Sequence, residues 1–212
     1  PALSQENLGA RPMGMGGAFA GLADDVNTIF INPAGITSIR KESGLVSTRL
    51  AAGREYTMIG GVQITPLGNL GIGYVGAMDP IDGPGLSNWD ENSPTRYTTQ
   101  TLYLSLARDL NREMRVPANM GNLSVGMNLK FSSRKLMTAN GLSQDGGSNV
   151  DVDLATVFRP NGDLSLGLSL QNFLSGGSAK EIADLNTVEE RKFAVLGGVA
   201  GKLFDGSVTW VV

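Results

Sequence analysis

The sequence predicts an all-β fold, namely an antiparallel transmembrane β-barrel of which about nine strands are visible, preceded by a short N-terminal helical hatch. Three observations predict this fold. Apolar residues alternate with small or polar residues from residue 42 onward, tight turns and long connections fall at opposite ends of the expected meander, and residues 1–41 lack the alternation. Strict alternation indicates strands with one apolar face and one polar face.

The alternation is clearest in the segments 122–135 and 163–173, where leucines and other apolar residues are separated by Ser, Gly and Asn. Eight apolar residues of these segments are expected to face lipid: Leu123, Val125, Met127, Leu129, Leu164, Leu166, Leu168 and Leu170. Several of the expected strands exceed the usual length of about five or six residues and approach the roughly 9–11 residues that cross a bilayer at a tilt. The strands are expected near residues 42–51, 55–65, 70–78, 96–108, 122–135, 149–158, 163–173, 191–203 and 206–212.

The connections between these strands form two groups. Pro, Asn, Asp and Gly predict tight turns at residues 66–69, 160–162 and 205–206. Long connections are expected at residues 79–95, 136–148 and 174–190, all at the opposite end of the meander. Transmembrane barrels have short turns on one side and longer loops on the other. The links at 52–54 and 111–121 depart from this division.

Composition narrows the possible functions. The chain has 212 residues, a net charge of -3, and neither Cys nor His. It therefore lacks thiol nucleophiles, thiolate metal ligands and the commonest general base, and its mild acidity does not favour nucleic acid. We expect no catalytic residue, no metal and no cofactor. The polar strand faces carry few charges, whereas the exposed strands of soluble proteins usually carry more Lys and Glu. A soluble β-sandwich binding module remains the alternative fold.

Residues 1–41 are expected to form the hatch, and residues 42–212 the strands of the barrel. Met13 to Asp25 has helical spacing, and Asn27 to Gly35 is a short apolar run that ends in a turn. Because single-chain barrels close with an even number of strands, we also expect further strands beyond Val212, or else strands supplied by a neighbouring chain.

Several residues of this segment invite specific predictions. The glycines at 14, 16 and 17 do not make a nucleotide loop, because Phe19 stands where the dinucleotide pattern needs its last glycine. Asp24 and Asp25 are expected at a helix end or hydrogen-bonded to the barrel wall, with Arg11 as a candidate partner. Asn32 can cap the turn that follows it, and Gly35 can take a positive φ.

The order of three short motifs, GARPMGMGGAF at 9–19, ADD at 23–25 and NPAG at 32–35, resembles the start of the PorV/PorQ family of outer-membrane β-barrel proteins. That family is related to the FadL-like transporters of long-chain fatty acids. A second stretch at 152–173 resembles a later hairpin of the family. Ile31 departs from the family pattern, in which Trp or Tyr often precedes NPAG. The hatch motif implied by the resemblance consists of Arg11, Met15, Gly16, Gly17, Phe19, Asp24, Asp25, Asn32, Pro33, Ala34 and Gly35.

The resemblance implies a location in the cell outer membrane and a closed barrel of about fourteen strands around the hatch. It implies a role in protein export or surface assembly, of the type IX secretion kind, without catalysis. The alternative is transport of hydrophobic small molecules. Expected partners are outer-membrane lipid, secretion-machinery or exported cargo proteins, and a hydrophobic ligand in the lumen.

Overall fold

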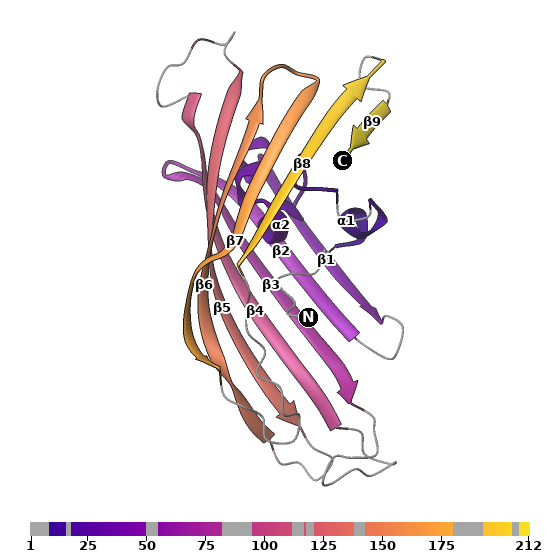
Figure 1. The fold of residues 1–212 in the computed structure, drawn as a ribbon, viewed down its shortest axis with the longest axis vertical. Helices are drawn as coiled ribbons and strands as arrows, with labels where there is room; N and C mark the ends of the chain where they lie inside the picture. The colour runs from indigo at the N-terminus through magenta and orange to yellow at the C-terminus, as the bar shows by residue number, and fades with distance from the viewer. Residues whose placement is uncertain are drawn as a thin grey trace.

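The computed structural model describes residues 9–15, 18–49, 55–81, 95–111, 117, 121–137, 143–179, 193–204 and 208–212. Within these residues nine strands form one antiparallel sheet in chain order, each strand pairing with the next along the chain, so the predicted all-β antiparallel fold is confirmed. The sheet curves around the N-terminal segment, whose helices lie on its concave side (Figure 1). The strands are β1 (Lys41–Arg49), β2 (Glu55–Thr65), β3 (Gly68–Ile81), β4 (Thr95–Asp109), β5 (Asn122–Met137), β6 (Ser143–Arg159), β7 (Leu164–Ala179), β8 (Ala194–Leu203) and β9 (Val208–Val211).

Most strands extend beyond their predicted ends, and this corrects one predicted connection. The segment 136–148 is not a long loop, because β5 continues to Met137 and β6 already begins at Ser143. Polar residues such as Ser143 continue the ladder because its hydrogen bonds come from the backbone and do not depend on an apolar side chain. The predicted loop 174–190 likewise loses its first residues to β7. The link at 52–54 lies outside the described residues.

Within the described residues three short helices precede the sheet, at positions that differ from the prediction. They are α1 (Ala10–Gly14), α2 (Thr28–Ile31) and the 3-10 helix η2 (Pro33–Ser38). The helix predicted from Met13 to Asp25 is wrong, since residues 18–22 form turns and Ala23 has a positive φ of 37°. Gly is a poor helix former, and this stretch contains four of them. The apolar run at residues 27–35 is largely helical, in α2 and η2.

The main hydrophobic core joins this N-terminal segment to the concave side of the sheet. Phe19, Ile29 and Phe30 of the segment pack with Tyr56 of β2 and Tyr103 of β4 in one buried cluster. The rings of Phe30 and Tyr103 meet edge to face, with centroids 5.1 Å apart. Such an aromatic pair stabilises a core beyond the area that it buries. The main core of the described residues therefore lies between the N-terminal segment and the concave side of the sheet, which we call the wall.

Candidate functional site

The N-terminal segment, here called the hatch, packs closely against glycines on the concave side of the sheet. A β-carbon at Gly73 of β3 would lie 2.7 Å from a ring carbon of Phe30, and one at Gly198 of β8 would lie 2.6 Å from the backbone nitrogen of Gly21. Real β-carbons do not approach other atoms so closely. Gly therefore lets the two backbones approach. At five further glycines a β-carbon would lie within 3.1 Å of a hatch atom: Gly44, Gly60, Gly71, Gly126 and Gly167.

Side chains of the wall donate hydrogen bonds to backbone carbonyls of the hatch. Asn128 Nδ2 of β5 lies 2.8 Å from the carbonyl oxygen of Ile29, and Ser165 Oγ of β7 lies 2.7 Å from that of Gly21. Asn69 Nδ2 of β3 donates to the carbonyl oxygens of residues 36 and 39 at 2.6 and 3.0 Å. Irregular backbone that is buried needs such partners, because an unpaired polar group costs free energy. Polar residues of three strands thus bind the backbone of the hatch.

Arg11 joins two distant parts of the hatch. Its guanidinium lies 2.5 Å from Asp24 Oδ1 and 2.7 Å from Asp25 Oδ2, so the predicted pairing is present. The hydrogen bond to Asp24 is the largest of the influences that raise the pKa of Arg11 above its ordinary value. Asp25 also accepts hydrogen bonds from the backbone and side chain of Asn27, just before α2, as expected for a residue at a helix end. The hydrogen bonds of Asp24 and Asp25 in the described residues thus join parts of the hatch and do not reach the strands.

Asn32 is the buried centre of the hatch turn. Its side chain donates to the carbonyl oxygen of Ala20 at 2.8 Å and to that of Thr156 on β6 at 3.3 Å, and its Oδ1 accepts from Ala34 N at 3.2 Å. The predicted cap is therefore present. The positive φ predicted for Gly35 is absent. Gly35 lies inside η2 with an ordinary φ, and it is small because a β-carbon there would overlap Ala23.

The other hatch-motif residues surround this turn. Pro33 opens η2 and is buried with Ala34 beneath β5. Phe19 is fully buried, and the guanidinium of Arg11 lies 5.6 Å from the centre of its ring. Met15 is half-buried against the core, while Gly16 and Gly17 lie outside the described residues.

Charged groups are buried in the wall itself. Lys130 Nζ of β5 is 2.6 Å from Asp153 Oδ1 of β6, and their side chains are 1% and 2% exposed. The same Nζ lies 2.6 Å from Asn172 Oδ1 of β7. Asn172 has a positive φ of 54°, and its backbone N donates to Asp153 at 2.8 Å where the β6–β7 register shifts. Asn128 donates to the other carboxylate oxygen at 3.2 Å, so the buried carboxylate has three donors.

The opposite, convex face of the sheet is apolar. Val125, Met127, Leu166 and Leu168 of the predicted lipid-facing set are exposed, Met127 to 43%, and the other four are half-buried. Large apolar residues of neighbouring strands continue this surface through cross-strand pairs. We call it the apolar belt: Ile59, Leu70, Ile72, Leu102, Leu104, Leu106, Leu123, Val125, Met127, Leu129, Phe131, Val150, Val152 and Leu154, with the four leucines of β7.

The belt ends at a row of polar and small residues. This row lies toward the end of the sheet where β3 is followed by residues 82–94 and β5 by residues 138–142. Gln100 of β4 pairs with Ser133 of β5, and Ser133 pairs with Ser148 of β6. Lys135 of β5 pairs with Thr98 of β4 one outward-facing step beyond. The boundary therefore runs across at least three neighbouring strands at matched register.

The buried network of Lys130, Asp153 and Asn172 is the main feature that the sequence prediction missed. Its signal is the position of Lys130 in the alternation, on the same face as Gly126 and Asn128. That position implies a charge directed toward the hatch side. The pairing with Asp153 needs the strand register as well.

Among the described residues no group of three or more acidic, His or Cys side chains could hold a metal ion. In the same residues no helix is long and apolar enough to cross a membrane. Comparison with protein-family models, with curated proteins and with solved structures finds no match.

Proposed function

We propose that the chain is a membrane-spanning β-barrel protein of the PorV/PorQ type, located in the cell outer membrane, and that it serves protein export or surface assembly without catalysis. The observation that carries the proposal is the polarity of the sheet. The ion pair of Lys130 and Asp153 is buried on the concave side, while the apolar belt is exposed on the convex side. Transmembrane barrels have this arrangement, with an apolar band toward lipid and a polar interior.

A soluble protein would have little reason for such a surface. Contiguous apolar patches on soluble monomers rarely exceed a few hundred Å², and larger ones mark contacts with proteins or membranes. Ile72 is 56% exposed and Met127 is 43% exposed, and both have apolar cross-strand neighbours on the same face. The pattern therefore favours the membrane over the soluble sandwich.

The height of the belt also fits a bilayer. On β5 the outward apolar residues run from Leu123 to Phe131, followed by Ser133 and Lys135. At about 3.4 Å per residue this run is about 27 Å long. At a strand tilt of about 40° it spans about 21 Å along the membrane normal, close to the apolar band of about 25 Å in outer-membrane barrels.

The interior favours export over transport of hydrophobic molecules. The concave side of β4 to β6 carries buried polar and charged side chains, among them Thr101, Lys130, Arg134 and Asp151. A hydrophobic molecule gains little free energy by burying its surface against polar groups. A hatch fixed by glycine contacts and by hydrogen bonds from three strands also supports a plugged barrel that acts through its loops.

Two measurements test the proposal. First, membranes of the source organism are extracted with alkaline carbonate, and the outer membrane is separated on a density gradient. The protein is expected in the extracted outer membrane, and its release into the soluble fraction would refute the membrane assignment.

Second, surface proteins and culture medium are compared with and without the gene by mass spectrometry, and uptake of a labelled long-chain fatty acid is measured in the same strains. Retention of exported proteins inside the cell with unchanged uptake supports export. Lost uptake with normal surface proteins would replace export by transport.

A further inference from the structure

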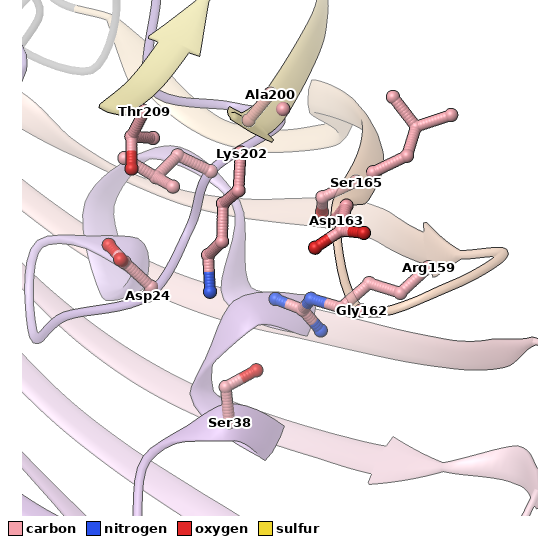
Figure 2. Close-up of a pocket in the computed structure, with 12 residues that line it drawn as sticks. Asp24, Ser38, Arg159, Gly162, Asp163, Ser165, Ala200, Lys202 and Thr209 are labelled. Atoms are coloured by element: carbon pink, nitrogen blue, oxygen red, sulfur yellow. The ribbon is translucent and has the colours of Figure 1, made fainter. Parts of the chain in front are cut away.

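A cavity of about 190 Å³ lies at the seam between the hatch and the sheet. Hatch residues Leu22 and Ser38 form one side, Arg159 and the residues of the β6–β7 turn form another, and Lys202 and Thr209 close it from β8 and β9. Figure 2 shows the guanidinium of Arg159 and the ammonium of Lys202 meeting at the centre, with the hydroxyl of Ser38 facing them.

Neither cation has a carboxylate in direct contact among the described residues, although the negative charges of Asp24 and Asp109 act on Arg159 from beyond ion-pair distance. Neither Arg159 nor Lys202 makes a side-chain hydrogen bond or an ion pair within 4.0 Å there, although Arg159 is half-buried. Like charges that converge repel each other, and a half-buried guanidinium loses part of its hydration. An oxyanion between them would relieve both effects, because Arg offers a fork of donors and Lys a point charge.

Two carboxylates also line the cavity, and neither neutralises the cations directly. Asp24 accepts hydrogen bonds from two nitrogens of Arg11, at 2.5 and 3.2 Å. Asp163 is exposed, and its carboxylate is not within ion-pair distance of Arg159 or Lys202. Arg159 and Lys202 therefore keep donors that no carboxylate in the described residues binds directly.

The walls of the cavity are held in place by backbone contacts. Lys202 N donates to the carbonyl oxygen of Asp163 at 2.8 Å, which fixes β8 to the β6–β7 turn. Ser165 Oγ donates to the carbonyl oxygen of Gly21 at 2.7 Å, which fixes the hatch to β7. The two cations thus extend from a preformed frame, which lowers the entropy lost on binding.

We propose that this cavity binds a small oxyanion, a phosphate or carboxylate group, between Arg159 and Lys202, with the hydroxyls of Ser38 and Thr209 as further donors. The bound anion links the hatch to β6 and β8. The site depends on the cavity alone and not on the proposed membrane function.

Isothermal titration calorimetry of the full chain, in one fixed buffer or detergent, tests the site with inorganic phosphate, succinate and chloride at equal ionic strength. Saturable binding of phosphate or succinate, with none of chloride, supports the proposal, and the better of the two identifies the natural group as phosphate or carboxylate. Binding of neither above chloride would overturn it.

Variants locate the binding. Lys202→Gln removes one cation from an exposed position that the fold does not need, and is expected to weaken binding about tenfold, as does Arg159→Gln. Lys135→Gln is the matched control, since it removes the same charge from an exposed residue of β5 outside the cavity. An equal loss in the control, or unchanged binding in Lys202→Gln, would contradict the assignment.

Discussion

A series of arginine substitutions along β5 gives a depth profile of the apolar belt. Leu123, Met127 and Phe131 all face outward on this strand, and Met127 is the middle position. Met127 pairs with Leu106 on one side and with Leu154 on the other, so its surroundings on this face are apolar. If the face is in lipid, an Arg at the midplane costs about 2–4 kcal/mol of unfolding free energy, against about 0–1 kcal/mol near the interfaces.

The rise and tilt of the strand determine the depth of each substituted position in the bilayer. Met127 lies four positions from either end of the run, about 14 Å along the strand at about 3.4 Å per residue. At a tilt of about 40° this becomes about 10 Å of depth, which brings both ends close to the edges of a band about 25 Å tall. We therefore expect Met127→Arg to be the most destabilising and Leu123→Arg and Phe131→Arg to be milder.

The assay is equilibrium unfolding by denaturant in phospholipid vesicles. Tryptophan fluorescence follows the unfolding of each variant and of the unchanged chain. Exposed substitutions in water usually change stability by about 0.5 kcal/mol or less. A flat profile within that range at all three positions would refute lipid exposure of this face.

Three further perturbations test the interior. Gly126→Val places a side chain against residues 33–34 of the hatch and is expected to loosen the hatch, which limited proteolysis would show as faster cleavage. Gly197→Val is the control, because a β-carbon there has no neighbour within 4 Å. Equal cleavage rates in the two variants would contradict the close packing of the hatch on the glycines. Lys130→Met leaves the carboxylate of Asp153 buried without its cation, and should lower the unfolding free energy by about 3–5 kcal/mol; a loss below 1 kcal/mol would show that the pair is hydrated. Deletion of residues 10–35 should raise solute flux in a liposome-swelling assay, and unchanged flux would count against a hatch that blocks a lumen.

Much of the sheet was predictable because its signal is local. Alternation with period two marks each strand, and the predicted limits of β2 coincide with the observed ones. The outer ends of β5 and β6 were missed because backbone pairing continues through Ser and Gln, whose side chains do not alternate in polarity. The limits of a strand depend on its neighbour as well as on its own sequence.

The hatch and its surroundings were less predictable. Arg11 could be named as a candidate partner of the two aspartates because the charges are opposite, but the positions of the short helices depend on packing against the sheet. Arg159 and Lys202 come from β6 and β8, which are separated by β7 in the sheet. Only the register brings the two side chains to one cavity, so no spacing in the sequence indicates that site.

Nitroxide labelling of the convex face tests the central claim most directly, because the chain has no native Cys. Single cysteines replace Met127 in the belt and, as the reference, Leu67 in the exposed β2–β3 turn. In vesicles, oxygen concentrates in the bilayer and a polar nickel chelate stays in water. The account predicts that relaxation of the label at 127 is dominated by oxygen and that of the label at 67 by the chelate. Domination by the chelate at both positions would show that the convex face is in water.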